Sequence, residues 1–434
     1  MAPRTPRCNR LLLIPSSAVT EGGGSVIICL NQEAKAKIMP KDELTGDAQW
    51  WLDRVDIAGP VIEAGAQEAD RIHELTRDGM KALHEQGMFR LLLSRKVGGA
   101  ELPLPVFIQI VERVAQYDGS AAWCICQGNG CAMLGGYLAP EVSSEIWEDK
   151  PAGVLAWGPG KAEATVVDGG YSVNAQSMFV SGSHHATWLA AHCSIVKERD
   201  GTVRLGADGN PENRTILVPA KHVELTDSWD VVGLRGTGTE GFTLDNFFVP
   251  EDHSIVRDTM IEKSGDTGPL YSFTTVSIYA MGFASTAMGI AQGFLDRFND
   301  MAQEKKPRRI NLSLSEMPVV HDEYARAHAR LSAARSYLCN SVNEAWREAE
   351  NSGAATVEQR MAIRLAATHA IHESKSAVDT LFDTGGTSSV FALAPFERRF
   401  RDIHAVALQI QGRKTNFGTV GAYLLGHATD MGVI

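Results

Sequence analysis

The chain has 434 residues, of which 44% are hydrophobic and 21% charged, an ordinary composition for a globular enzyme built of two or three packed layers. Its formal net charge of -11 gives no electrostatic support for a nucleic-acid partner. The cysteines include no C-x-x-C pair, and Cys124, Cys126 and Cys131 lack a histidine or a second pair to complete a zinc shell. We therefore expect no metal site and a reducing, cytoplasmic location.

The first 45 residues lack the periodicity of the rest of the chain. Arg4, Arg7 and Arg10 precede a short apolar run that ends at Pro15. This run is too short for the apolar core of an export signal, and the glycines at 22–24 favour a flexible tail over 1–45. No stretch approaches the roughly 20 apolar residues of a membrane span, so we expect no membrane association.

Helical periodicity begins near Asp47. Apolar residues recur at helical spacing over three segments, 48–58, 68–86 and 104–117. Gly119 and Ser120 then begin a helix of small and apolar residues over 121–138, and Pro140 begins a short helix through Trp147. These segments predict an N-terminal helical domain over 46–150.

Between residues 151 and 255 the apolar period changes to two, which predicts strands. Asp168-Gly169-Gly170 is a hairpin signal within this block. An uninterrupted block of strands between helical blocks predicts a separate, β-barrel-like middle domain over 151–255. The candidate strands are 154–157, 162–167, 171–177, 188–196, 215–219 and 242–249.

The remaining residues, 256–434, return to helical spacing. Long helices without an internal proline are predicted over 275–305, 319–350 and 357–383, and helix resumes over 400–408 after Gly385-Gly386. Helices of this length usually pack as a bundle. The predicted fold class is α+β: an N-terminal helical domain, a middle β-barrel-like domain and a C-terminal four-helix bundle.

Four local motifs occur within these predicted domains. They are the Phe179 to Trp188 segment after a strand, the W-x-x-x-G-L-R-G-T-G-T turn at 229–239, the Phe247 to Pro250 strand end, and the R-R-F-R-D run at 398–402. Their order and spacing, over residues 47 to 428, resemble the acyl-CoA dehydrogenase superfamily. In its dehydrogenases a glutamate that removes the substrate's α-proton usually follows the R-D signature. The corresponding stretch here, 407–412, reads A-L-Q-I-Q-G and has no carboxylate.

Other details resemble the two-component flavin hydroxylases of this superfamily. Ser120-Ala121-Ala122-Trp123 and the 401–405 run R-D-I-H-A are similar to segments of 4-hydroxyphenylacetate, secosteroid-phenol and dibenzothiophene monooxygenases. The resemblance implies a monooxygenase that takes reduced flavin, FAD or FMN, from a separate NAD(P)H-dependent reductase. With O2 as co-substrate it would insert one oxygen atom into a small aromatic or heteroatom-containing substrate through a flavin C4a-hydroperoxide.

Two other functions stay open. The first is an acyl-CoA dehydrogenase or oxidase with tightly bound FAD, for which Asp402 or Glu373 would supply the carboxylate. The second is a non-catalytic flavin-binding protein that has the fold without its bases.

The resemblance also implies which residues contact the flavin. It assigns this role to Arg308 and to the turn Gly385-Gly386-Thr387, which would reach the flavin phosphate of a neighbouring subunit in a homotetramer, since helix ends favour anions. The other residues implied in flavin binding are Phe179, Ser181, Ser183, Arg235 and Thr237.

Three residues are candidates for the catalytic pocket. Gln409 stands where related hydroxylases commonly have a histidine, eight residues after the signature Arg401, and His404 lies about one helical turn nearer. Asn129, with Gln127, occupies the helix after Ser120, where the family often has a histidine. An amide donates and accepts hydrogen bonds but is no base at neutral pH, so we expect a substrate that needs no deprotonation.

Overall fold

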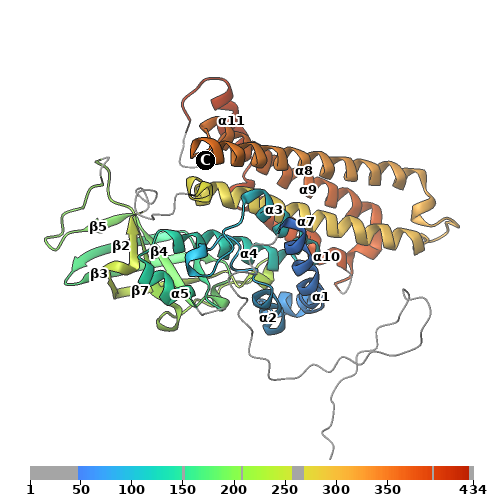
Figure 1. The fold of residues 1–434 in the computed structure, drawn as a ribbon. Helices are drawn as coiled ribbons and strands as arrows, with labels where there is room; N and C mark the ends of the chain where they lie inside the picture. The colour runs from blue at the N-terminus through green and yellow to red at the C-terminus, as the bar shows by residue number, and fades with distance from the viewer. Residues whose placement is uncertain (1–46, 149–151, 207–208, 257–267, 393–394, 430–434) are drawn as a thin grey trace, which may run out of the picture. The chain divides into compact units, whose positions relative to one another are not determined.

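The structure, a computed structural model, describes residues 47–148, 152–206, 209–256, 268–392 and 395–429. Helices, strands and helices follow one another along the chain, as the colours of Figure 1 show. The predicted α+β fold class is confirmed. The tail expected over 1–45 lies outside the described residues, so that expectation stays a prediction.

The N-terminal block contains α1 (Ala48–Ile72), α2 (Arg77–Glu85), α3 (Leu104–Tyr117), α4 (Gly119–Ala132) and α5 (Pro140–Trp147). The sequence predicts two separate helical segments over 48–58 and 68–86. This prediction is wrong, because α1 continues through Pro60 to Ile72. The chain then breaks at His73, which has a φ of 61°, and Thr76 caps α2 by accepting a hydrogen bond from the backbone N–H of Gly79.

Helix α4 contacts elements of all three blocks. Asp118 caps it by accepting a hydrogen bond from the backbone N–H of Ala121 at 2.8 Å. All of its 14 residues are buried, and apart from Gln127 and Asn129 their side chains are small or apolar on every face. It packs against α3, strand β1 and the bundle helix α7, so its side chains can reach the other two blocks.

The middle block is formed by two packed four-stranded sheets, with strand orders β1-β4-β6-β8 and β5-β2-β3-β7. Their inner faces share one apolar core that includes Val173, Leu189, Ile216 and Phe242. The predicted strand 188–196 is in fact two strands, one in each sheet. The strands are β1 (Leu155–Trp157), β2 (Gly160–Val167), β3 (Gly170–Val180), β4 (Trp188–Cys193), β5 (Ile195–Lys197), β6 (Arg214–Pro219), β7 (Glu240–Pro250) and β8 (Ser254–Val256).

The pairing of β3 sets the position of the following loop. β3 runs antiparallel to β2 and to β7, and its register with β7 shifts between Ser177 and Val180. Phe179 lies in this irregular part with a φ of 54°, a conformation that side chains other than glycine seldom adopt. The bulge turns the Phe179 ring outward, where it is 58% exposed.

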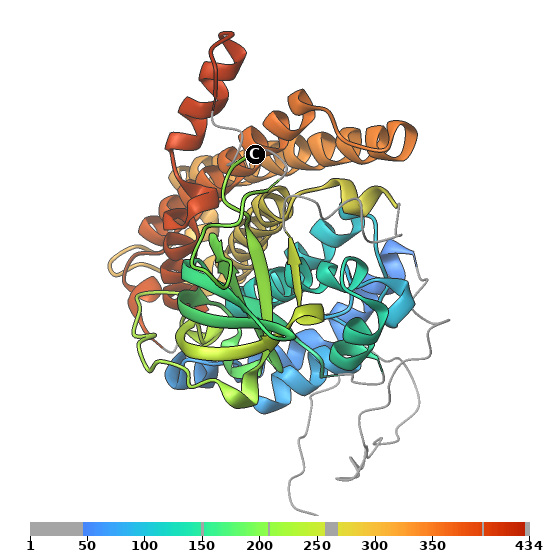
Figure 2. The same cartoon turned by 90° about the vertical axis from the view of Figure 1, so that its left-hand side faces the viewer.

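The C-terminal block contains the four long helices α7 (Thr275–Glu304), α8 (Pro318–Ser352), α9 (Val357–Gly385) and α10 (Pro395–Leu408), followed by α11 (Thr415–Leu424). The chain turns between α9 and α10 in η11 (Gly386–Val390), and between α10 and α11 in η12 (Ile410–Gly412). α11, in red, extends from one end of the bundle in Figure 2.

Helix α7 is the core helix of the bundle. It packs against α3, α4, α9 and α10. By length and composition alone it could cross a membrane, but 89% of its most apolar window is buried inside the protein. Its apolar surface is therefore already covered by neighbouring helices.

Candidate active site

Ser181, at the end of β3, lies in a chain of hydroxyl groups. Its Oγ accepts hydrogen bonds from Trp123 Nε1 and from Thr239 Oγ1, both at 2.9 Å. Thr237 Oγ1 lies 2.6 Å from Thr239 Oγ1 and 2.7 Å from the carbonyl oxygen of Leu234, and its one proton can be donated to either of them. These bonds join the strand end, helix α4 and the G-L-R-G-T turn into one polar centre.

An aromatic stack continues from this centre into the bundle. The Trp123 ring of α4 lies 3.7 Å from the Phe283 ring of α7 at an interplanar angle of 6°. Phe283 stacks in turn on Tyr279, with ring centroids 5.4 Å apart. The Tyr279 hydroxyl donates to the carbonyl of Gln127 at 3.3 Å, and burial raises the pKa of this phenol, which therefore stays neutral.

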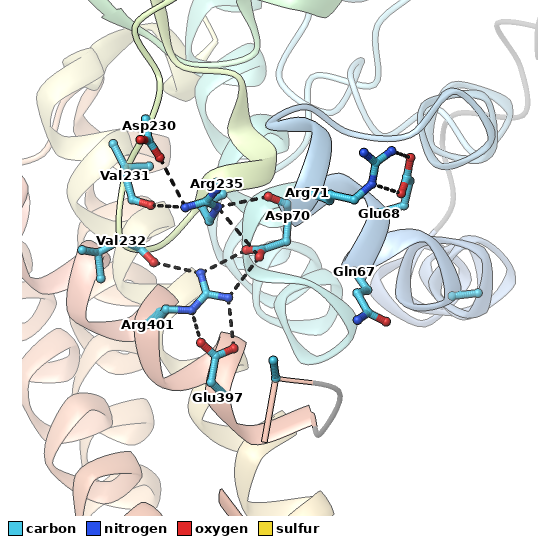
Figure 3. A pocket seen from close by; sticks show the side chains of 12 residues that line it. Gln67, Glu68, Asp70, Arg71, Asp230, Val231, Val232, Arg235, Glu397 and Arg401 are labelled. Carbon is cyan, nitrogen blue, oxygen red and sulfur yellow. Dashed lines mark hydrogen bonds and ion pairs between the residues drawn. The ribbon is translucent and has the colours of Figure 1, made fainter. Parts of the chain in front are cut away.

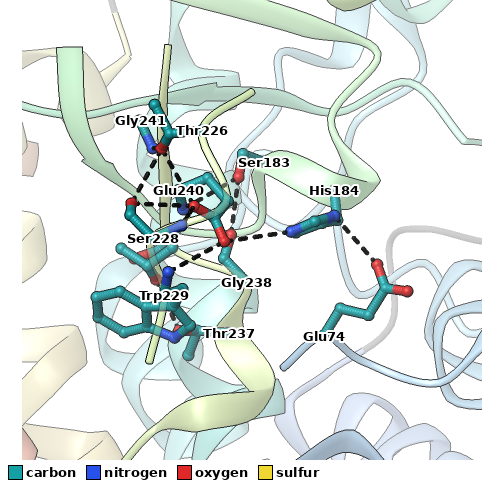
Figure 4. Close-up of polar contacts among 12 residues, drawn as sticks. Glu74, Ser183, His184, Thr226, Ser228, Trp229, Thr237, Gly238, Glu240 and Gly241 are labelled. Carbon is teal, nitrogen blue, oxygen red and sulfur yellow. Dashed lines mark hydrogen bonds and ion pairs between the residues drawn. The ribbon is translucent and has the colours of Figure 1, made fainter. Parts of the chain in front are cut away.

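Ser183 fixes the neighbouring turn, as Figure 4 shows. Its Oγ donates to the carbonyl of Gly238 at 2.8 Å and accepts from the backbone N–H of Glu240 at 3.3 Å. The hydroxyl of Ser183 thus uses its proton and one of its two lone pairs inside the protein. These bonds shape the loop around Ser181.

Glu240 holds the loop that carries Trp229 (Figure 4). Its carboxylate accepts hydrogen bonds from the backbone N–H groups of Ser228, at 2.8 Å, and Trp229, at 3.3 Å. Burial raises the pKa of Glu240, but hydrogen bonds from Ser228, Thr226 and Trp229 outweigh it and hold the pKa below its usual value. The anchored Trp229 ring meets the Phe179 ring edge-on, with centroids 6.5 Å apart.

Arg235 points toward α1, as Figure 3 shows. Its guanidinium donates to the carbonyls of Asp70, at 3.1 Å, and Val231, at 2.9 Å, and it contacts His73 Nε2. Arg401 donates to both carboxylate oxygens of the same Asp70 at 3.1 Å. Both arginines line an open groove of about 1020 Å³ between α1, the 230–235 loop and α10. Arg235 therefore locks the turn onto α1, with its donors directed to protein groups.

The turn that the resemblance assigns to the flavin phosphate contacts Lys305, near the predicted Arg308 in the sequence. Lys305, at the end of α7, donates a hydrogen bond to the carbonyl of Gly385, at the end of α9. A Cβ placed on Gly386, whose φ is 56°, would lie 3.9 Å from Lys305 Nζ. Thr387, the next residue of the turn, is exposed, and so is Arg308, three residues after Lys305. Burial lowers the pKa of Lys305. Sequence reasoning singled out Arg308, but Lys305 makes the contact with the turn.

Gln409 follows the last residue of α10. Its Oε1 accepts a hydrogen bond from the backbone N–H of Gln411 at 2.7 Å. Its Nε2 is buried and has no hydrogen-bond partner among the described residues. A buried amide donor without an acceptor is costly, so this group fits a position that faces a ligand.

His404 lies between α10 and α9. Its Nδ1 lies 2.7 Å from the carbonyl of Phe400, and its Nε2 lies 3.2 Å from Asp379 Oδ1. The ring also packs on Phe400, with centroids 4.3 Å apart. Both ring nitrogens thus have partners within the bundle, which is the environment of a packing residue.

Asn129, a candidate for the catalytic pocket, is held by backbone groups on both sides of its amide. It is completely buried, and its Nδ2 donates to the carbonyls of Met88, at 2.8 Å, and Ile125, at 2.9 Å. Its Oδ1 accepts from the backbone N–H of Leu92 at 3.1 Å. These bonds use both amide protons, and they tie α4 to the 88–92 segment.

The two carboxylates that a dehydrogenase could use are engaged elsewhere. Asp402 is buried and accepts a hydrogen bond from the backbone N–H of Leu234 at 2.6 Å. Glu373 accepts one from Arg330 of α8 at 3.0 Å, at the surface of the bundle. Neither carboxylate takes part in the Ser181 centre. In the part of the chain that the structure describes, no group of three His, Cys, Asp or Glu side chains could hold a metal ion.

Comparison with known proteins gives the class of this fold. Residues 281–411 match the family model for the acyl-CoA dehydrogenase C-terminal domain. XiaF from Streptomyces sp., solved in complex with FADH2 and glycerol, has the same fold, with a TM-score of 0.80 and 21% identity over 89% of this chain and 97% of that chain. The fold is thus acyl-CoA dehydrogenase-like.

Two curated relatives indicate which enzyme activity occurs in similar proteins. The indole-3-acetate monooxygenase of Pseudomonas putida is 26% identical and covers 83% of this chain and 89% of its own length. The oxygenase subunit HsaA of a flavin-dependent monooxygenase of Rhodococcus jostii is also 26% identical, over 82% of this chain and 92% of its own length. The chain is thus similar to monooxygenases, one of them the oxygenase subunit of a flavin-dependent enzyme, and its C-terminal part matches the acyl-CoA dehydrogenase family model, as the motifs predicted.

The residues present fit a flavin. The exposed Phe179 ring offers an apolar surface at the strand end, and Ser181 and Gln409 carry polar groups with unused hydrogen-bonding capacity. Lys305 beside Gly386 suits a phosphate, because an ammonium group has three donors and only one is used on Gly385.

Proposed function

We propose that this chain is the oxygenase component of a two-component flavin-dependent monooxygenase. It receives reduced FAD or FMN from a separate NAD(P)H-dependent reductase and uses O2 to oxygenate a small aromatic or heteroatom-containing substrate in the cytoplasm. When bound, the reduced flavin supplies the two electrons that O2 activation requires. One oxygen atom enters the substrate and the other leaves as water.

One observation supports this proposal most strongly: the two carboxylates that a dehydrogenase could use as a base already accept hydrogen bonds from protein groups. A dehydrogenase needs a carboxylate free to remove an α-proton beside the flavin. Asp402 accepts a hydrogen bond from the backbone N–H of Leu234, and Glu373 accepts one from Arg330. The C-terminal stretch offers the amide of Gln409 in place of a base, and an amide does not titrate.

The protein groups have distinct roles in this proposal. Ser181 and Phe179 contact the flavin ring, Lys305 and the Gly385-Gly386 turn hold its phosphate, and Gln409 orients the substrate through its free N–H group. The stack of Trp123 on Phe283 excludes water from one side of the centre, because both rings are more than nine-tenths buried.

We further propose that the protein works as a homotetramer. Large apolar side chains are exposed near the ends of α9, α10 and α11, in an amount that a monomer would seldom leave in water. A second subunit packed there would cover them and bring a neighbouring chain close to the phosphate turn. These residues are Val390, Phe391, Leu408, Ile410, Leu424 and Leu425.

The proposal is tested by reconstitution. The purified chain is mixed with FMN or FAD, NADH and an unrelated flavin reductase, and product formation is followed over a panel of indoles, phenols and thioethers. Substrate-dependent product that requires both reductase and O2 supports the proposal. An acyl-CoA that reduces a tightly bound FAD without O2 would favour the dehydrogenase alternative instead.

A further inference from the structure

The hydrogen-bonding capacity of Ser181 is limited by its two partners. A serine hydroxyl has two acceptor lone pairs and one proton. Trp123 Nε1 and Thr239 Oγ1 both donate to Ser181 Oγ at 2.9 Å, which occupies the two lone pairs. No hydrogen bond donated by the Ser181 hydroxyl is present among the described residues. What the hydroxyl can still offer a ligand is its proton.

Trp123 is itself held rigidly in this position. Its ring is 8% exposed and lies parallel to Phe283, at an interplanar angle of 6° and a centroid distance of 3.7 Å. Phe283 stacks in turn on Tyr279. Because this stack fixes the plane of the indole, it also fixes the direction of the N–H group that points at Ser181 Oγ.

We infer that Trp123 is a positioning residue that acts on the flavin through Ser181. By occupying one lone pair of the Ser181 hydroxyl, the indole N–H directs the free proton of that hydroxyl toward an acceptor atom of the flavin ring. The inference rests on the proposed function only in requiring that a flavin binds beside Ser181. It gives the S-A-A-W segment of α4 a role beyond helix packing.

The test is a double-mutant cycle on flavin binding. FMN and FAD are titrated into the wild-type protein, Trp123→Phe, Ser181→Ala and the double variant, and the affinity and the visible absorption band of the oxidised flavin are recorded. Phenylalanine keeps an aromatic ring against Phe283 but removes the N–H group. One neutral hydrogen bond changes an affinity by about fivefold, so we expect Trp123→Phe to weaken flavin binding by about that factor and to shift the absorption band.

The double-mutant cycle distinguishes a positioning role of Trp123 from a packing role. If Trp123 acts through Ser181, Trp123→Phe has no further effect on affinity or spectrum in the Ser181→Ala background. The matched control is Trp346→Phe in α8, since Trp346 is also 8% exposed, donates to Glu350 Oε1 at 2.8 Å and stacks on Phe273. This control should leave the flavin affinity and spectrum unchanged.

The outcomes distinguish this inference from the proposed function. Flavin binding by Trp123→Phe that equals wild type, or an effect that persists in full without the Ser181 hydroxyl, would overturn the inference alone. A wild-type protein that binds neither oxidised nor reduced flavin would overturn the proposed function and the inference together.

Discussion

The carboxylate of Asp402 accepts a hydrogen bond from the backbone N–H of Leu234 at 2.6 Å, so the R-F-R-D run of α10 holds the G-L-R-G-T turn of the middle domain. Arg401, the residue before it, donates to the carbonyl of Val232 at 2.8 Å. The backbones also meet closely, because a Cβ on Gly233 would lie 2.2 Å from the carbonyl oxygen of Arg401. The R-F-R-D run and the G-L-R-G-T turn thus form one junction between α10 and the middle domain.

We expect Asp402 to make stability depend on pH. Burial, followed by the charge of Asp118, raises the pKa of Asp402 to about 7. An unfolded aspartate has a pKa of about 3.9, so the folded state binds the extra proton between these values. The stabilising contribution is therefore complete below about pH 4 and is lost as pH rises to about 7.

Asp402→Asn is the variant that tests this. Asparagine keeps an oxygen that can accept from Leu234, so the fold should survive. Its unfolding free energy, from denaturant titrations at several pH values, should fall less than that of wild type between pH 4 and 7. Asp245→Asn, at an exposed position of β7, is the control for the loss of one charge. Parallel pH curves for wild type and Asp402→Asn would show that Asp402 titrates normally.

A second prediction concerns the phosphate site at Lys305. Lys305→Met should weaken the binding of FMN about tenfold or more, since a charge-assisted hydrogen bond contributes about 1.5–3 kcal/mol. The affinity for riboflavin, which has no phosphate, should stay the same. Lys306→Met is the matched control, because Lys306 is the exposed neighbour in the sequence. Equal losses for FMN and riboflavin would mean that Lys305 shapes the turn without touching a phosphate.

A third prediction concerns Gln409. Removal of its free N–H group in Gln409→Ala should weaken substrate orientation, so that more of the oxygen consumed appears as hydrogen peroxide while flavin affinity is kept. Gln409→His should add a pH-dependent limb to the rate near pH 6.5, the ordinary pKa of histidine. Gln303→His, at an exposed position of α7, should add none. Unchanged coupling and an unchanged pH profile in both Gln409 variants would identify it as a packing residue.

The oligomeric state gives a fourth prediction. Light scattering at micromolar concentration should give about four times the 47.0 kDa of one chain, because the exposed leucines of α10 and α11 need a covering surface. Leu408→Asp, at a side chain that is 82% exposed, should reduce this mass without unfolding the bundle. A stable wild-type monomer would contradict the tetramer and the shared phosphate site.

The order of the three blocks can be predicted from the sequence, because apolar residues repeat at helical spacing over 46–150 and 256–434 and at every second position over 151–255. The roles of single polar residues cannot, because their partners are distant in the chain. Asn129 is satisfied by backbone groups of Met88 and Leu92, and no local pattern around Asn129 indicates those bonds. The hydrogen bond between Trp123 and Ser181 joins residues 58 positions apart in the sequence, and it depends on how α4 packs against the middle domain.

The same reason applies to the residues that the resemblance assigns to the flavin. The polar atoms of Arg235 and Ser183 bond to neighbouring loops, contacts that their motifs do not indicate. The contact of Lys305 with Gly385 is likewise not indicated by the sequence around either residue. A motif locates a segment, and only packing decides which of its side chains faces a ligand.

The measurement that tests the proposed function most directly is the fate of isotopically labelled O2. The wild-type protein is supplied with reduced flavin by a reductase and with the substrate that gives the highest coupled turnover, and the product is analysed by mass spectrometry. The monooxygenase account predicts one labelled oxygen atom in each product molecule and the other in water. A product that gains no label, or gains its oxygen from water, would contradict the account.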